Sequence, residues 1–224
     1  MSLLVEHKLE RRRNIQKAAR ALIEERGYDG LTMRDLAERA RVSVPTLYNL
    51  FGSKDAILIA ELQDVAAELA RSIPNTGDSF MARGMVVFEA GQRAIENAPE
   101  FFRSVTRMLM TSPESSETRR ASEEAFIAIM AANLHAAKRA GQLADWAEPN
   151  LVARHMFGQY MATFLSWSLG ELDGPTFRVA AESGICHLLI GVARGPFAAE
   201  VEARLRLIQV WAHHQENSDA AARR

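Results

Sequence analysis

The side chains best suited to specific chemistry lie close together within the first 54 residues. Thr46 and Asn49 stand three positions apart in a short segment predicted to be helical, and Ser43 and Pro45 precede them. Positions three apart share one face of a helix. Small polar groups on such a face can reach base edges in the major groove of DNA, where each base pair presents its own donors and acceptors. The expected chemistry is recognition of a duplex.

Two short helices position this face. The first begins at Thr32, whose hydroxyl can accept the backbone amide of Asp35, and ends near Arg41. Ser43 is a natural cap for the second. An amphipathic helix over about 7–26 precedes these two helices. This pattern of three helices predicts a helix-turn-helix. A plain helical hairpin would show similar periodicity, so the flanking side chains must separate the two interpretations.

Hydroxyl and cationic side chains flank the motif. Thr32 and Arg34 at the start of one helix, and Lys54 at the start of the next, are placed to contact the phosphates that border a groove. Residues 1–54 hold 11 Lys and Arg against 7 Asp and Glu, a net charge of +4, whereas residues 55–224 hold 16 against 21, a net charge of −5. Because a positive field attracts phosphates, we expect the N-terminal segment to bind double-stranded DNA.

Six stretches of the N-terminal segment follow a known pattern in order over about 50 residues: Ile15–Ala19, Glu25–Tyr28, Leu31–Ala37, Val42–Ser43, Thr46–Tyr48 and Phe51–Asp55. Together they resemble the DNA-binding domain of transcriptional regulators of the TetR family (TetR/AcrR type). The resemblance implies that Thr46 and Asn49 face the groove and that Tyr48 and Lys54 contact backbone phosphates. It further implies a transcription regulator, by default a repressor, that binds a palindromic operator as a dimer and is released by a small apolar or aromatic effector.

Two positions depart from the usual pattern of the family. Arg41 stands where the family commonly has glycine in the turn. It either adopts a positive φ, at a cost of about 1 kcal/mol, or relaxes the turn, and its side chain can alternatively reach a phosphate. Leu50 replaces a histidine that often precedes the matching phenylalanine, so this position offers no phosphate contact.

The rest of the sequence predicts helices, because helix formers are abundant and apolar residues recur at spacings of three and four. We find no convincing strand. We therefore expect an all-α fold, with a DNA-binding domain over 1–54 and a larger effector-binding and dimerisation domain over 55–224. The fourth helix should end near Arg71, before a break at Pro74, and residues 217–224 should be frayed. Further helices are expected over 78–97, 99–112, 116–141, 148–170, 175–194 and 197–216.

Several apolar stripes of the larger domain contain polar side chains. Such stripes are usually core, but a buried polar group needs a partner, which is a neighbouring side chain, a water molecule or a ligand. We expect an adaptable, mostly apolar cavity that binds a small-molecule effector of unknown identity. The candidate residues come from four predicted helices: Met85, Phe88 and Gln92; Phe102, Val105 and Leu109; Phe126, Met130 and Asn133; and His155 and Gln159.

The predicted helix over 148–170 is apolar on nearly every side, so a second chain is expected to cover part of it. Gly184 and Gly191, two turns apart on the next helix, allow a close approach of helices, either between subunits or within one. A palindromic operator likewise requires two copies of the motif. We expect a homodimer, and the resemblance implies a four-helix bundle across its two-fold axis.

Patterns of other functional classes are missing from the sequence. Cys186, the single cysteine, precedes His187 directly; adjacent residues point apart on a helix, so they form no nucleophile and base pair. A single cysteine cannot form the thiolate cluster that binds zinc. No Glu stands three residues before a histidine, which excludes the usual pattern of helical di-iron sites. The sequence also lacks a glycine-rich loop that could bind phosphate. We expect no enzyme activity, no metal and no cofactor. A helical binding or scaffolding protein without a DNA function is the alternative.

The sequence also suggests where the protein works. No apolar run approaches the roughly 20 residues that cross a bilayer, and the N-terminus lacks the apolar stretch of a signal peptide. One cysteine suits a reducing compartment. We expect a cytoplasmic protein with no membrane partner.

Overall fold

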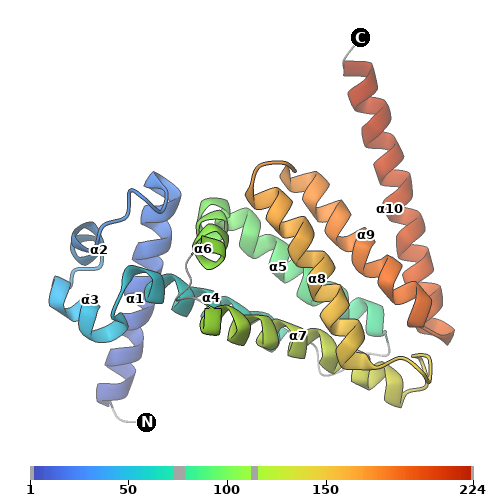
Figure 1. The fold of residues 1–224 in the computed structure, drawn as a ribbon, viewed down its shortest axis with the longest axis horizontal. Helices are drawn as coiled ribbons and strands as arrows, with labels where there is room; N and C mark the ends of the chain where they lie inside the picture. The colour runs from blue at the N-terminus through green and yellow to red at the C-terminus, as the bar shows by residue number, and fades with distance from the viewer. Residues whose placement is uncertain (1–2, 73–78, 112–115, 223–224) are drawn as a thin grey trace. The chain divides into compact units, whose positions relative to one another are not determined.

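The structure, a computed structural model, describes residues 3–72, 79–111 and 116–222. Over these residues the chain is helical, and an isolated antiparallel bridge pairs Leu143 with Ala193, so the predicted all-α fold is confirmed. The helices are α1 (Leu3–Arg26), α2 (Met33–Arg39), α3 (Val44–Phe51), α4 (Lys54–Ser72), α5 (Phe80–Asn97), α6 (Pro99–Thr111), α7 (Ser116–Arg139), α8 (Pro149–Ser168), α9 (Gly174–Val192) and α10 (Gly195–Ala222) (Figure 1).

Contacts within the chain define two compact units. The N-terminal unit comprises Met1–Glu68 and Arg93–Ser122, and the C-terminal unit comprises Leu69–Gln92 and Glu123–Arg224. Each unit therefore joins segments that are distant in sequence. The predicted domain boundary between residues 54 and 55 stays a prediction.

Two helix boundaries differ clearly from the expectation. α1 begins at Leu3, ahead of the predicted residue 7, and α10 continues to Ala222, although fraying was expected from residue 217. The three alanines that end α10 are the strongest helix formers, which favours continuation of the helix. The break predicted at Pro74 lies outside the described residues.

The turn between α2 and α3 contains a residue in the left-handed conformation. Arg41 has a φ of 55°, which confirms one of the two alternatives for this position. Its amide donates to the carbonyl of Glu38 at 3.1 Å, and the amide of Val42 donates to the carbonyl of Ala37 at 2.9 Å. These two bonds close the Schellman motif that often ends a helix, in which glycine is preferred because a Cβ atom is strained there.

We expect Arg41→Gly to be more stable than Arg41→Ala by about 1 kcal/mol, because only alanine keeps the strained Cβ atom. Gly141, with a φ of 68°, ends α7 with the same pair of bonds and serves as a control. Gly141→Ala should lose a similar amount. Urea unfolding at constant pH measures the differences. Equal stability of the two Arg41 variants would mean that the turn carries no strain.

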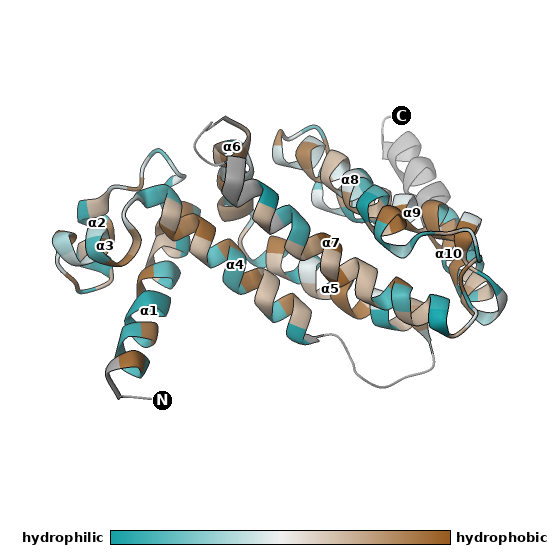
Figure 2. Cartoon of the chain, turned by 60° about the horizontal axis from the view of Figure 1, so that its bottom comes forward, coloured by the Kyte–Doolittle hydropathy of each residue, from teal (hydrophilic) through white to brown (hydrophobic). Residues whose placement is uncertain are grey.

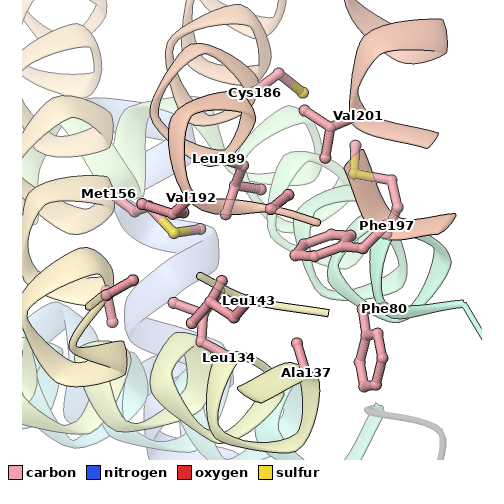
Figure 3. Packing of buried hydrophobic residues seen from close by; sticks show 14 of the residues in the cluster. Phe80, Leu134, Ala137, Leu143, Met156, Cys186, Leu189, Val192, Phe197 and Val201 are labelled. Carbon is pink, nitrogen blue, oxygen red and sulfur yellow. The ribbon is translucent and has the colours of Figure 1, made fainter. Parts of the chain in front are cut away.

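The C-terminal unit has a continuous apolar core built from α5, α7, α8, α9 and α10. Phe80 and Phe197 pack edge to face with ring centroids 5.9 Å apart, and Val201 and Leu134 are almost fully buried (Figure 3). Cys186 lies in this core, and burial raises the pKa of its thiol to about 11. The thiol therefore stays neutral and packs as a small apolar side chain, as the sequence predicts.

Helix α9 packs side by side with α8 and covers much of the apolar surface of α8 (Figure 1). The rings of Trp167 and Phe177 lie 5.6 Å apart, and those of Phe164 and Phe177 lie 5.8 Å apart. Leu151, by contrast, remains 54% exposed. The surface left for a second chain is thus narrower than the sequence of α8 suggests.

A buried ion pair joins α9 to α10. Glu182 is 5% exposed, and its carboxylate accepts a hydrogen bond from Nε of Arg204. This bond raises the pKa of Arg204. One turn earlier on α9, Arg178 pairs with Glu89 of α5.

Candidate functional site

The outward face of α3 carries the side chains predicted to read DNA. Ser43 caps the helix: its Oγ accepts the amide of Thr46 at 3.3 Å and lies 2.8 Å from Oγ1 of Thr46. Leu47 is fully buried and fixes the rotation of the helix. As a result, Thr46 is half-buried and the other predicted residues are exposed, namely Ser43, Pro45, Tyr48 and Asn49.

The start of α2 is fixed by a local cap. Oγ1 of Thr32 accepts the amide of Asp35 at 3.1 Å, as predicted, and donates to Oδ2 of Asp35 at 2.7 Å. Arg34 is exposed in the same turn. Two hydrogen bonds of 2.8 and 2.7 Å from Arg39 to the carboxylate of Glu25 fix α2 to α1 and lower the pKa of Glu25.

Lys54 is engaged within the protein, a role that the sequence did not reveal. Its Nζ donates to the carbonyl oxygens of Tyr28 at 3.1 Å and of Leu31 at 3.2 Å, and it lies 3.7 Å from the centroid of the Tyr28 ring. The Tyr28 hydroxyl donates to Asp55, and burial together with this bond raises the pKa of Tyr28. Lys54 therefore holds the loop before α2 against the start of α4. Only its remaining donor is left for the predicted phosphate contact.

We expect Lys54→Met to lower the free energy of unfolding by about 1–2 kcal/mol, because two partly buried carbonyl groups lose a charged donor. The methionine keeps most of the apolar stem. Lys17→Met, at an exposed position of α1, is the control and should change stability by less than about 0.5 kcal/mol. Thermal and urea unfolding measure both variants. Equal stability of the two variants would contradict a structural role for Lys54.

Arg12 of α1 holds the other end of α3. Its Nη1 donates to the carbonyl of Leu50, and its guanidinium lies 4.1 Å from the centroid of the Phe51 ring. The last turn of α3 contains no basic residue, so a cation from elsewhere complements its carbonyl end. The sequence shows Arg12 within a run of three arginines, but it does not reveal the contact with the end of α3.

Glu24 of α1 caps a helix that follows much later in the chain. Its Oε1 accepts the amide of Phe101 at 2.6 Å, and its Oε2 accepts the amide of Glu100 at 3.4 Å. Both amides belong to the first turn of α6, which begins at Pro99, and amides of a first turn have no carbonyl partner within their own helix. A carboxylate is favourable at this position because of the helix dipole.

Residues 15–60 match the sequence model that describes bacterial regulatory proteins of the tetR family. The match spans the second half of α1, all of α2 and α3 and the start of α4, which are the elements that build the face described above. The N-terminal segment of the chain is thus similar to the DNA-binding segment of tetR-family regulators. The HTH-type transcriptional repressor KstR of Rhodococcus jostii (strain RHA1) is 32% identical over 108 residues, which are 48% of this chain and 51% of KstR. The chain spans about half the length of the curated relatives it matches.

Solved structures of TetR regulators share the fold. SmeT, the repressor of the Stenotrophomonas maltophilia multidrug efflux pump SmeDEF, superposes with a TM-score of 0.66 at 18% identity, over 83% of this chain and 92% of SmeT. Thermus thermophilus FadR, a TetR-family repressor solved in complex with lauroyl-CoA, gives a TM-score of 0.64 at 22% identity, over 83% of this chain and 97% of FadR.

The candidate effector residues fall in both units. Phe102, Val105 and Leu109 belong to the N-terminal unit, where the first two are buried and Leu109 is half-buried. The others belong to the C-terminal unit. There Gln92 is buried, His155 is exposed and the remaining residues are half-buried: Met85, Phe88, Phe126, Met130, Asn133 and Gln159.

The polar candidates differ in how their hydrogen bonds are satisfied. Asn133 donates from Nδ2 to the Phe80 carbonyl at 2.8 Å and accepts from Nε of Arg83 at 3.1 Å, so both ends of its amide have protein partners. Gln92 is 2% exposed, and its Nε2 has no hydrogen-bond partner within the described part of the chain. His155 lies on the solvent-facing stripe of α8 and does not share the apolar interior, contrary to its assignment from sequence.

Gln159 bridges α8 and α9. Its Nε2 donates to the Ala180 carbonyl at 3.3 Å and to Oγ1 of Thr163 at 3.2 Å. A Cβ atom at Gly184 would lie 1.9 Å from this nitrogen, so Gly184 is small because of crowding within the subunit. Gln159 thus has a structural role, although its buried Oε1 has no partner among the described residues.

The described residues contain neither a metal-binding cluster nor a helix that could span a membrane. No group of three or more His, Cys, Asp or Glu side chains there is arranged to hold a metal ion. Within the same residues, no helix combines the length and apolar character that crossing a membrane requires.

Proposed function

We propose that this chain is a DNA-binding transcriptional repressor that acts as a homodimer on a palindromic operator and is released by a small, mostly apolar effector. The observation that carries the proposal is the capped helix α3, whose exposed face presents Tyr48 and Asn49 while Leu47 anchors the opposite face. A helix held in this way can enter a major groove without rearrangement. The repressor name of KstR supports the sign of regulation.

Selection of bound sequences from a random duplex pool tests this function. A repressor of this type should enrich one inverted repeat, with half-sites about one helical turn or a multiple apart. Mobility shifts with the enriched duplex and with a scrambled duplex then give the specificity ratio. A helical scaffolding protein, the alternative class, would enrich no sequence.

The exposed stripes of α8 and α9 support a dimer built from these two helices. Gly158 and Gly191 both face open space, since a Cβ atom built at either one would meet nothing within 4 Å. Small residues beside exposed apolar ones allow two helix pairs to approach closely across a two-fold axis. The exposed stripes contain Leu151, His155, Gly158 and Ala162 on α8, and His187, Ile190 and Gly191 on α9, with Arg194 just beyond the end of α9.

Sedimentation equilibrium should give the mass of two chains at micromolar concentration. Ile190→Glu should raise the dissociation constant of the dimer at least tenfold, because association would bury an unpaired carboxylate. Leu207→Glu, at an exposed apolar position of α10, is the matched control and should leave the dimer intact. If Leu207→Glu dissociates the dimer and Ile190→Glu does not, the interface lies on α10.

The interior of the C-terminal unit suits an apolar effector that carries a hydrogen-bond acceptor. Gln92 offers an unpaired buried amide donor, and Met85 and Phe88 precede it on the same helical face of α5. Since the FadR structure contains lauroyl-CoA, this thioester is the first effector to test. We expect it to release the operator duplex in a mobility shift. Release by coenzyme A alone would argue against an apolar site.

A further inference from the structure

Helix α1 begins before the segment that matches the family model. It starts at Leu3, whereas the match starts at residue 15. Residues 3–14, called the extension of α1 below, therefore lie outside the matched segment, and this part of α1 is drawn mostly in the colours of hydrophilic residues (Figure 2). The extension contains four of the exposed or half-buried cations of the N-terminal unit: Lys8, Arg11, Arg12 and Arg13.

The contacts of Arg12 place this extension beside the end of α3. Its guanidinium bonds to the Leu50 carbonyl and stacks on Phe51, so α1 passes the carbonyl end of the helix that carries Tyr48 and Asn49. Lys8 lies one turn before Arg12, about 6 Å further along the axis of α1. The extension thus continues the surface of α3 beyond its last turn.

Three cations are crowded on this part of α1. Lys8, Arg11 and Arg12 stand at positions i, i+3 and i+4, where like charges face one another and destabilise a helix. Arg12 has protein partners, but Lys8 and Arg11 are exposed, and no ion pair to either occurs among the residues that the structure describes. An acidic partner would relieve this repulsion.

The two sides of α1 differ in what they face. Arg11 and Glu25 are fourteen residues apart and share one side, and Glu25 bonds to Arg39 of α2. Lys17 and Glu24 are seven residues apart and share another side, on which Glu24 caps α6. Arg11 therefore lies toward the helices with DNA-facing side chains. Arg13, four residues before Lys17, lies on the side of α6.

We propose that Lys8 and Arg11 bind phosphates of the DNA duplex immediately outside the base pairs that α3 contacts. The inference rests on the proposed DNA-binding function and adds a second surface to it. Phosphate oxygens would supply the negative charge that the cluster lacks, and contacts of this kind carry no sequence preference. The extension of α1 would then lengthen the bound duplex without changing the sequence that is read.

The salt dependence of binding tests the proposal. The enriched duplex is made in two lengths, one ending at the enriched sequence and one extended by about five base pairs on each side, which is half a helical turn. On the long duplex, Lys8→Gln/Arg11→Gln should reduce the slope of log affinity against log salt by about two units per protomer, since each lost phosphate contact removes about 0.9. On the short duplex the same variant should match the parent protein.

Arg13→Gln/Lys17→Gln is the matched control, because it removes the same charge from exposed positions on the other side of α1. It should leave the slope on the long duplex unchanged. If both double variants lowered the slope equally, the effect would depend only on the net charge of the protein, and the proposal would be overturned. So would an unchanged slope for Lys8→Gln/Arg11→Gln. If the parent protein enriches no duplex at all, the DNA-binding function itself fails, which is a separate outcome.

Discussion

Glu182→Ala is expected to lower the free energy of unfolding by about 1–3 kcal/mol. The substitution would leave the Arg204 guanidinium without its carboxylate in a partly buried position between α9 and α10. Removing one member of a buried pair costs more than the pair contributes, because the remaining charge loses its hydrogen-bond partner and is not fully hydrated. Urea unfolding followed by circular dichroism measures the loss.

Two further variants make this result specific to a buried pair. Glu202→Ala breaks the pair between Glu202 and Arg206, whose side chains are 55% and 76% exposed, and should cost less than about 0.5 kcal/mol. Glu182→Leu/Arg204→Met removes both charges and should recover most of the stability. A loss for Glu182→Ala no larger than that for Glu202→Ala would show that solvent reaches the pair.

Thr46→Ala and Asn49→Ala are each expected to relax the preference for one or two base pairs in every half-site. A good contact to a base edge discriminates by about 1–3 kcal/mol, which is about five- to 150-fold in affinity ratio. Neither change removes a charge, so the slope of log affinity against log salt should stay the same. Titration of matched and singly mutated operators at several salt concentrations measures both quantities.

Arg34→Ala provides the contrast, since Arg34 is exposed in the first turn of α2 and is expected to contact a phosphate. It should weaken all sequences about equally and lower the slope by about one unit per protomer. Tyr48→Phe should also be blind to sequence but should leave the slope unchanged. If Arg34→Ala altered base preference while Thr46→Ala and Asn49→Ala did not, α3 would not be the helix in the groove.

The features of the motif that the sequence predicted correctly depend on contacts within one turn. The hydroxyls of Thr32 and Ser43 accept amides three residues later, so each cap is visible as a polar residue before an apolar run. The positive φ of Arg41 was one of two alternatives, because the resemblance marked the position as one that usually takes glycine.

The roles that the sequence did not reveal depend on partners far along the chain. Lys54 bonds to a carbonyl 26 residues away, Arg12 to one 38 residues away and Glu24 to an amide 77 residues away. A single sequence shows that such residues are charged but not which backbone group they meet. The exposure of His155 was likewise not predictable, because the helix around it is apolar and its pattern does not show which side faces solvent.

The bond between Glu24 and the first turn of α6 restricts how that helix can move. α6 can slide or tilt only if α1 follows it or if the amides of Glu100 and Phe101 give up their carboxylate. While this bond is intact, α1 and α6 are therefore coupled mechanically at their ends, and a displacement that starts in α6 is passed on to the helix that bears Arg12.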